Sequence, residues 1–278
     1  MFNPIRKLFH QDIYLRTGAM QGVIGIDIGS AYSKGVLMSG SDIVHSVVLP
    51  SGGNYGSTAD QVRERLLSGS RLNEDDIKMI VATGLGAKTV SFAHETKTDI
   101  SCHNLCVSRA FPSVRTVVDV GDLHSKAFRM DEAGNLVRFL MSSKCAGGSG
   151  RVLKVLARVL QVPVEDLGEL SLASQTRVDF NTGCAVFAES EAVSRIAEGT
   201  KKEDLVAGIH RALAAQILSL AERVGLEGDF ALTGGWARDK GLVAATGEAV
   251  PLKVVIPPRP IMTASIGAAM FAADMVRP

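Results

Sequence analysis

The sequence has few cysteines, no long apolar run and almost no net charge. Four cysteines in 278 residues are too few for the disulfide framework of a small secreted protein, so metal binding, catalysis and burial remain as their roles. No apolar stretch approaches the roughly 20 residues that span a membrane. The net charge of +1 argues against a binding mode based on neutralising nucleic-acid phosphates. We therefore expect a cytoplasmic protein with no membrane and no nucleic-acid partner.

The chain does contain enough apolar sequence for a substantial core. Hydrophobic residues make up 46% of it, which suits one large domain or two of ordinary size. Residues 1–22 carry Arg6, Lys7 and scattered apolar residues, but neither an apolar h-region nor a small-residue cleavage site, so they are not a secretory signal. We expect either a packing arm or a stretch that precedes a true start at Met20.

Two segments of the chain are related by a constant offset of 92 residues. GIDIGSAYSKGVLM begins at Gly25, and VDVGDLHSKAFRM repeats its pattern in the middle of the chain. Each copy continues into a polar, glycine-containing turn and a further β-branched run, which is typical of a β-hairpin. The match indicates an internal duplication. The identical pairs are Asp27/Asp119, Gly29/Gly121, Ser33/Ser125, Lys34/Lys126 and Met38/Met130.

The alternation of strands with helices predicts an α/β protein built from two related halves. Two such halves favour two subdomains around a cleft. Helical patterns cover residues 59–69, 203–224 and 263–275. We expect an N-terminal extension over 1–22, a first subdomain over 23–112 and a second over 113–278, with the C-terminal helix packing back toward the cleft.

Each copy of the repeat ends a strand on an aspartate and then turns at a glycine. Glycine lets backbone N–H groups approach a phosphate closely, and an aspartate can hold Mg²⁺ directly or through its water shell. One copy alone fits an ordinary hairpin, but two matching copies favour phosphate loops. The candidate residues are Asp27 and Asp119 for the metal, and Gly29, Ser30, Ser33 and Gly121 for the phosphates.

A third glycine-rich turn, ALTGGWARDKG, occupies residues 231–241. It is typical of a buried strand, a glycine pair and a helix, although any tight turn between strand and helix can carry two glycines. Gly234 and Gly235 would let an adenosine lie against bare backbone. Two other stretches are set aside: GLGAKT at 84–89 lacks the spacing of a P-loop, and His94-Glu95 lacks the second histidine of a zinc-protease motif.

Two of the four cysteines precede helical patterns. Cys145 lies in SSKCAGGSGRVLKVLARVL, and Cys184 lies in NTGCAVFAESEAVSRIA. A helix N-terminus lowers a thiol's pKa and favours anionic ligands, so the two thiols suit an iron–sulfur cluster tuned by backbone N–H groups. The alternative is that both are buried small hydrophobic residues, the common fate of free cysteine.

Seven segments together resemble the activator ATPases of 2-hydroxyacyl-CoA dehydratases and the ATP-binding subunits of benzoyl-CoA reductase (the BcrAD/BadFG-type family). The resemblance spans about residues 23–273. It implies a duplicated actin/hexokinase-type (ribonuclease H-like) ATPase fold and an ATPase that drives low-potential electron transfer. The segments are GIDIGSAYSK, ISCH, KCAGGSGR, CAVFAESE, AGIHRAL, LTGGWA and SIGAAM.

The same resemblance implies a [4Fe-4S] cluster shared between two subunits, held by Cys145 and Cys184 of each. It assigns the loop Gly29–Ser33, including Ala31 and Tyr32, to the phosphates of ATP with Mg²⁺. The adenosine is assigned to the pair Gly234/Gly235. The implied partners are catalytic reductase or dehydratase subunits and a ferredoxin-like electron donor.

The segment ISCH is a connecting element near the cleft in this family. Cys102 and Cys106 are therefore not expected to be cluster ligands, although histidine lies between them and the spacing is short.

The second phosphate loop departs from the family's usual D-I-G-G-Q-D-x-K. Asp122 replaces a glycine, Leu123 replaces a glutamine that can position water, and His124 replaces an aspartate. The change resembles the δ-type subunit of benzoyl-CoA reductase, so we expect a heterodimer with a related subunit that keeps the usual loop. The alternative is a homodimeric activator of a 2-hydroxyacyl-CoA dehydratase. A sugar or acid kinase on this fold would not explain the cysteines, and an actin-type scaffold would bind nucleotide without iron.

Overall fold

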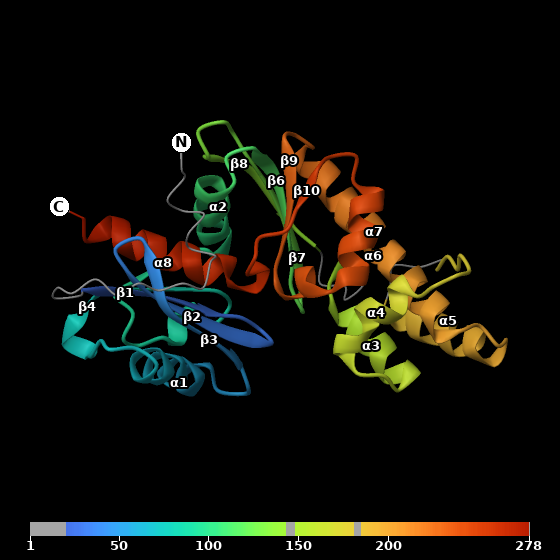
Figure 1. Cartoon of the computed structure of the whole chain (residues 1–278), viewed down its shortest axis with the longest axis horizontal. Helices are drawn as coiled ribbons and strands as arrows, with labels where there is room; N and C mark the ends of the chain where they lie inside the picture. The colour runs from blue at the N-terminus through green and yellow to red at the C-terminus, as the bar shows by residue number, and fades with distance from the viewer. Residues whose placement is uncertain (1–20, 143–147, 181–184, 278) are drawn as a thin grey trace. The chain divides into compact units, whose positions relative to one another are not determined.

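The computed structural model describes residues 21–142, 148–180 and 185–277 (Figure 1). The chain divides into two compact units. The first comprises the described residues up to Pro112, the short stretch Glu132–Asn135 and the segment from Met262 onward; the second comprises Ser113–Asp131 and Leu136–Ile261. The C-terminal segment therefore belongs to the first unit, whereas the division expected from the sequence kept it with residues 113–278.

A mixed five-stranded sheet organises the first unit, in the order β3-β2-β1-β4-β5. β1, β2 and β3 form an antiparallel meander, and β4 and β5 continue the sheet in parallel with β1. The strands are β1 (Gly22–Ile28), β2 (Tyr32–Ser39), β3 (Asp42–Pro50), β4 (Ile77–Thr83) and β5 (Glu95–Thr96).

The sheet of the second unit has the order β10-β9-β6-β7-β8. β6, β7 and β8 are antiparallel neighbours, and β9 and β10 run parallel to β6. The strands are β6 (Val114–Val120), β7 (Ser125–Met130), β8 (Leu136–Met141), β9 (Asp229–Thr233) and β10 (Val254–Val255).

The two sheets therefore share one topology, with β1 to β5 matched in turn by β6, β7, β8, β9 and β10. The residue register agrees as well. Asp27 lies opposite Lys34 across β1 and β2, and Asp119 lies opposite Lys126 across β6 and β7. Matching topology and register are what a duplication produces.

Helices cover both faces of the first sheet. α1 (Tyr55–Ser68) packs its apolar side on one face, where Val62 and Leu66 join Ile24 and Ile26 in the core. α8 (Thr263–Met275) lies on the other face and contacts α2 (Asp99–Ala110) (Figure 1). α1 begins earlier than the helical pattern at 59–69 indicates, because Asn54 caps it by accepting from the Ser57 N–H at 3.0 Å.

Close packing of α8 on the first sheet depends on small residues. A Cβ added at Gly25 of β1 would lie 2.2 Å from both the Ser265 oxygen and the Ala269 nitrogen. The helix backbone thus rests directly on the strand, which is what the small-residue pattern at 263–275 allows.

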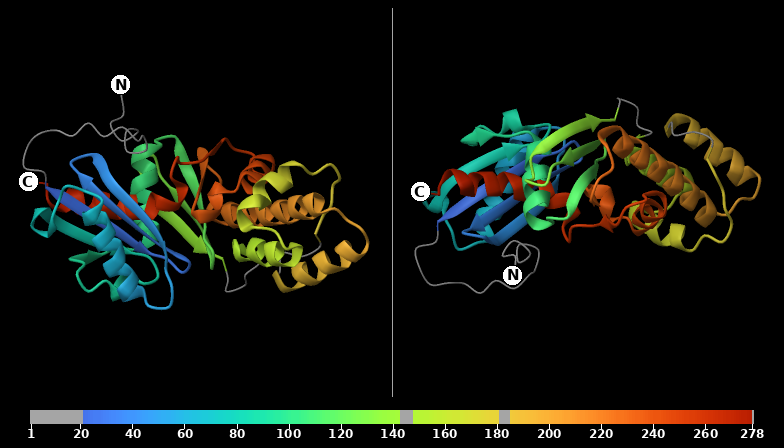
Figure 2. Two further views of the ribbon diagram at one scale, coloured as in Figure 1. Left: turned by 60° about the horizontal axis from the view of Figure 1, so that its bottom comes forward. Right: turned by 90° about the horizontal axis from the view of Figure 1, so that it is seen from above.

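The second unit is mostly helical outside its sheet, as Figure 2 shows. Helix α6 (Lys202–Val224) crosses the sheet and packs Leu213 and Ile217 on Val118 and Ala127 of the strands. The α-helices of the second unit are α3 (Arg151–Leu160), α4 (Leu167–Leu172), α5 (Ala185–Ala197), α6 (Lys202–Val224) and α7 (Lys240–Ala249). Short 3₁₀ helices in the two units cover η2 (Glu74–Asp76), η3 (Ala87–Thr89), η5 (Val164–Asp166), η6 (Gly235–Arg238) and η7 (Pro260–Met262).

Among the described residues, no helix combines the length and apolar character that crossing a membrane would require.

Candidate functional site

The carboxylate of Asp27 lies at the end of β1, against the side chain of Lys34. Lys34 Nζ lies 2.6 Å from Asp27 Oδ2, and the two side chains are only 11% and 8% exposed. Lys34 Nζ also donates to the Tyr32 carbonyl oxygen at 3.2 Å. One lysine compensates the buried negative charge, and the remaining lone pairs of the carboxylate stay available to a cation or its water shell.

The turn after Asp27 is tight, and hydrogen bonds within and beneath it hold its shape. The Gly29 N–H donates to the Tyr32 carbonyl at 3.2 Å, and a Cβ at Gly29 would lie 2.7 Å from that same oxygen. The hydroxyls of Ser33 and Ser51 are 2.9 Å apart, and Ser51 donates to the Gly29 carbonyl at 2.7 Å. Ser33 is fully buried and so shapes the turn from beneath. Ser30 and Ala31 of the turn are half-buried, and Tyr32 is exposed.

The second loop repeats this geometry. The Gly121 N–H donates to the His124 carbonyl at 3.1 Å, and a Cβ at Gly121 would lie 2.7 Å from that oxygen. Asp119 is buried, 6% exposed, and accepts from Thr233 Oγ1 at 3.3 Å. The changed residues at 122–124 therefore leave the backbone of the turn intact.

Gly84 and Gly234 form a further matched pair of the two units, which the constant offset of 92 residues does not reveal. Each follows the threonine that ends a parallel strand, and that threonine lies beside the aspartate of its own unit. φ is +87° at Gly84 and +92° at Gly234. An added Cβ would lie 2.3 Å from Asp27 Oδ1 in the first unit and 2.7 Å from Asp119 Oδ1 in the second. Each carboxylate thus lies against bare glycine backbone.

The glycine pair of the third loop joins β9 to the short helix η6. The Gly234 N–H donates to the Pro260 carbonyl at 2.9 Å. Gly235 is open by comparison, since the nearest atoms to an added Cβ belong to Ile261 at 3.6 Å. Gly234 is crowded, since a Cβ there would lie 2.5 Å from the Val120 carbonyl oxygen, so the two glycines differ in the room beside them. That this pair accepts an adenosine stays a prediction.

The first turn of α3 is attached to both loops of the second unit. The Gly150 N–H donates to the Gly121 carbonyl at 3.0 Å. Lys154 Nζ lies 2.6 Å from Asp122 Oδ1. The indole of Trp236 lies so close to Gly150 that a Cβ there would fall 1.8 Å from Trp236 Nε1. The departure at Asp122 has a structural partner, which sequence reasoning did not find.

The predicted cluster ligands, Cys145 and Cys184, lie outside the described residues. Their flanking elements are described. α3 starts six residues after Cys145, and α5 starts at Ala185, directly after Cys184. Helices follow both cysteines in the chain, as the sequence predicts.

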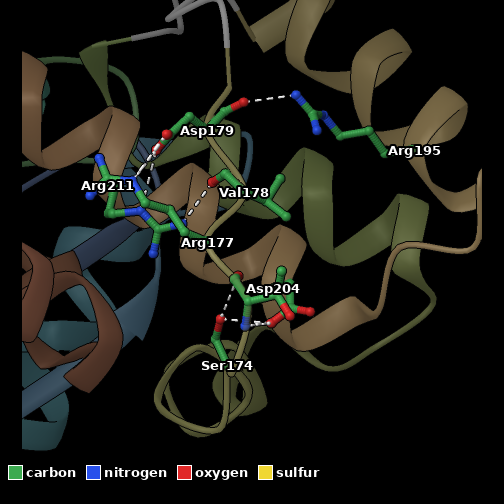
Figure 3. A network of polar contacts seen from close by, with 8 residues as sticks. Ser174, Arg177, Val178, Asp179, Arg195, Asp204 and Arg211 are labelled. Atoms are coloured by element: carbon green, nitrogen blue, oxygen red, sulfur yellow. Dashed lines mark hydrogen bonds and ion pairs between the residues drawn. The ribbon is translucent and has the colours of Figure 1, made fainter.

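The segment leading toward Cys184 is tied to two helices (Figure 3). From α6, Arg211 donates to the Val178 carbonyl at 2.7 Å; from α5, Arg195 donates to the Asp179 carbonyl at 2.8 Å. Asp179 also pairs with Arg177 at 3.0 Å. These contacts fix the backbone at residues 178 and 179 against the two helices.

A second anchor in the same region is Asp204, near the start of α6 (Figure 3). One carboxylate oxygen accepts from Ser174 Oγ at 2.8 Å, from the Gln175 N–H at 3.0 Å and from the Thr176 N–H at 2.9 Å. The backbone N–H of Thr176, followed by the Ser174 hydroxyl, lowers the pKa of Asp204.

The other two cysteines are buried in α2. Burial raises the pKa of both the Cys102 and the Cys106 thiol to about 12. A Cβ at Gly267 of α8 would lie 1.9 Å from the Cys102 carbonyl oxygen, so Cys102 lies in a tightly packed helix contact. That these cysteines are not ligands stays a prediction.

Within the part of the chain that the structure describes, no three His, Cys, Asp or Glu residues gather to form a metal site. Mg²⁺ prefers oxygen ligands and keeps several of its own waters. The buried aspartate of each unit, which lies beside bare glycine backbone, offers carboxylate oxygens of that kind.

A sequence profile of the BadF/BadG/BcrA/BcrD ATPase family matches residues 24–272. The 2-hydroxyisocaproyl-CoA dehydratase activator of Clostridioides difficile is 40% identical over 90% of this chain and 94% of its own length. A solved structure of the activator of the 2-hydroxyisocaproyl-CoA dehydratase from Clostridium difficile, with bound ADPNP, has a TM-score of 0.87 and 38% identity, covering 92% of this chain and 95% of that one.

One of the benzoyl-CoA reductase subunits of Thauera aromatica is 31% identical over 69% of this chain and 68% of its own length. A ROK hexokinase from Thermus thermophilus has a TM-score of 0.51 at 14% identity, covering 92% of this chain and 99% of that one. The likeness to a hexokinase at so low an identity concerns the fold alone, and the fold is the duplicated actin/hexokinase type expected from the sequence.

Proposed function

The chain belongs to the BadF/BadG/BcrA/BcrD ATPase family, and from this premise we propose that it is the ATP-driven activator of a 2-hydroxyacyl-CoA dehydratase. The observation that carries the proposal is the likeness to such an activator over nine-tenths of the chain, at 40% identity. The preference for a δ-type benzoyl-CoA reductase subunit, drawn from Asp122, Leu123 and His124, has weaker support. The benzoyl-CoA reductase relative matches a shorter part of the chain at lower identity, and the backbone of the altered turn keeps the geometry of the first loop.

Nucleotide binding is assigned to the matched loops. Asp27 and Asp119 would position Mg²⁺, the turns at Gly29–Ser33 and Gly121 would bind phosphate through backbone N–H groups, and Gly234/Gly235 would accept the adenosine. The two buried carboxylates, each beside bare glycine backbone, support this assignment. Lys34 would neutralise Asp27 until a metal ion arrives.

The electron-carrying part is assigned to Cys145 and Cys184. A [4Fe-4S] cluster needs four ligands, and two cysteines from each of two copies supply them in a symmetric dimer. When bound, the cluster would supply a one-electron carrier of low potential. The role of the chain around it is to hold the two thiolates at the starts of helices, where backbone N–H groups favour negative charge. The contacts of Arg195 and Arg211 with residues 178–179 would hold the chain segment that leads to Cys184.

ATP turnover would act through the loops of the second unit. A change of phosphate occupancy at the Gly121 turn alters the charge beside α3, since that turn is hydrogen-bonded to the helix start. The electron would come from a ferredoxin-like donor and pass to a catalytic dehydratase that itself binds the CoA thioester.

The deciding experiment is anaerobic purification of the chain expressed alone. We expect a homodimer with four iron atoms, Mg-dependent ATP hydrolysis, and ATP-dependent activation of a 2-hydroxyacyl-CoA dehydratase. In the Cys145→Ser and Cys184→Ser variants iron should be lost while nucleotide binding, measured by calorimetry, remains. A monomer that acquires iron only when co-expressed with a related subunit would refute the homodimer and favour the benzoyl-CoA reductase assignment.

A further inference from the structure

We infer that Lys154 senses phosphate at the second loop and passes that state to helix α3, by exchanging Asp122 for a phosphate group of the bound nucleotide. The inference rests on the proposed nucleotide site and deepens it, since it names the residue that registers which nucleotide is bound. Lys154 is a positioning residue here, because it acts on α3 and not on the reacting atoms.

An ion pair joins the turn at Gly121 to helix α3. Lys154 Nζ lies 2.6 Å from Asp122 Oδ1, with the lysine side chain 38% exposed and the aspartate 14% exposed. Asp122 is the residue directly after Gly121, so its carboxylate lies on the turn to which phosphate binding is assigned. The loop therefore carries its own anion, the Asp122 carboxylate. That carboxylate pairs with Lys154, the cation that a phosphate bound at this turn would also attract.

A bound phosphate changes the balance in two ways. It adds negative charge beside Asp122, which repels the carboxylate, and it offers Lys154 a stronger anionic partner. Lysine is suited to such an exchange because its ammonium group lies on a long flexible stem and binds phosphate as a point charge. Because the Asp122 side chain is mostly buried, water and salt screen this repulsion less than they would at the open surface.

The helix is placed to respond. Lys154 lies in the first turn of α3, and the residue before that helix, Gly150, donates its N–H to the Gly121 carbonyl at 3.0 Å. Trp236 from the glycine-pair loop covers Gly150. The start of α3 therefore contacts both nucleotide loops of its unit, and a change in the Lys154 pairing alters the restraint on that start.

Trp236 provides the readout, because it is the only tryptophan in the chain and is 8% exposed against Gly150. The full-length protein, purified anaerobically, is excited at the tryptophan band and titrated with MgADP and with a non-hydrolysable Mg-ATP analogue. We expect the two nucleotides to give different end-point emission in the unaltered protein. In Lys154→Met the ADP end point should remain and at least half of the ADP–ATP difference should be lost, whereas Lys154→Arg should keep the difference.

Asp122→Asn tests the other partner, and its nucleotide-free emission should move toward the ATP-bound value because Lys154 is already released. The matched control is Lys253→Met, which removes a surface partner of Asp229 at the opposite end of β9 and should leave every end point unchanged. A Lys154→Met variant that keeps the full difference would overturn the inference. Unaltered protein that binds neither nucleotide by calorimetry would overturn the nucleotide site itself, so the two failures are distinguishable.

Discussion

Lys34 Nζ lies 2.6 Å from Asp27 Oδ2, and the same two residues face each other in register across β1 and β2. The register is repeated by Asp119 and Lys126 across β6 and β7. A strand pair that fixes a lysine opposite an aspartate places a compensating positive charge beside the buried carboxylate. It also means that a magnesium ion near Asp27 competes with a charge that the protein supplies.

Replacing Asp27 with Asn should lower Mg-ATP affinity roughly ten- to a hundredfold, since a hydrogen bond to a charged group contributes about 1.5–3 kcal/mol. Iron content should stay unchanged, because the assigned ligands Cys145 and Cys184 belong to the other part of the chain. Calorimetry of MgATP binding and iron analysis check the two expectations.

Asparagine is preferred over alanine at this position. Both variants remove the carboxylate charge, but the asparagine side-chain oxygen can still accept a hydrogen bond from Lys34, whereas alanine offers it no acceptor. Leaving a buried charge without its partner costs about 3–5 kcal/mol of folding stability. Asp60→Asn, on the exposed side of α1, serves as the control for a lost charge in the same unit. ATP affinity that stays at the unaltered value in a folded Asp27→Asn protein would show that Asp27 does not bind the metal.

The duplication was predictable only where the two copies keep a constant spacing. Asp27 and Asp119 are found by the offset of 92, but 56 residues separate Asp27 from Thr83 while 114 separate Asp119 from Thr233. The second copy carries α3, α4 and α5 between its third and fourth strands. This insertion moves Thr233-Gly234 out of register with Thr83-Gly84, so the pair appears only when the strands are superposed by topology.

Contacts between side chains of distant segments cannot be predicted from the sequence either. The helix patterns at 203–224 and 263–275 identify α6 and α8 because periodicity is a local property. The pairing of Asp122 with Lys154 and the cover of Gly150 by Trp236 depend on how the chain returns to the loop. Taken from the sequence alone, the three residues at 122–124 favour a benzoyl-CoA reductase subunit, whereas the relatives support a dehydratase activator better.

Gly84→Ala should impair nucleotide binding as severely as Gly234→Ala, although the motif around Gly84 does not match a P-loop. A Cβ at Gly84 would lie 2.3 Å from Asp27 Oδ1, so the carboxylate must move. Gly40→Ala is the matched control, since Gly40 has a positive φ of +60° but no atom within 4 Å of an added Cβ. Both substitutions place alanine at positive φ and share that conformational cost. Equal nucleotide affinity in the Gly84→Ala and Gly40→Ala proteins would contradict the assignment.

Replacing Cys102 and Cys106 together with Ala should leave the iron content unchanged. Burial raises the pKa of both thiols to about 12, so at pH 8 almost none of either is the thiolate that ligates iron. The native protein should accordingly resist alkylation at these two positions, as read by mass spectrometry of the peptides. Loss of about half the iron in the double variant would assign them to the cluster after all.

Asp204→Asn should destabilise the protein at pH 7 and much less at pH 3. The three donors to one carboxylate oxygen lower the pKa of Asp204 in the folded state, so the unfolded state takes up the proton more readily. The contribution of this carboxylate is therefore present above the ordinary aspartate pKa and is lost as pH falls through the lowered value. Chemical denaturation at both pH values measures the difference, which should be about 1–2 kcal/mol at pH 7. A difference that is equal at the two pH values would show that charge is not what Asp204 contributes.

Leu123→Gln should raise the rate of ATP hydrolysis while leaving nucleotide affinity nearly unchanged. The Gly121 turn already has the backbone geometry of the first loop, so binding through N–H groups does not depend on the side chain at 123. Leucine has no polar group with which to orient a water molecule, whereas glutamine has both a donor and an acceptor. Leu123→Ala separates the two effects, because it removes the leucine without adding the amide. We expect a several-fold gain in kcat for the glutamine variant and none for alanine, in line with the effect of positioning a nucleophile. If both variants hydrolyse ATP at the same rate, the side chain at 123 does not act on the attacking water, and the slow step lies elsewhere in the cycle.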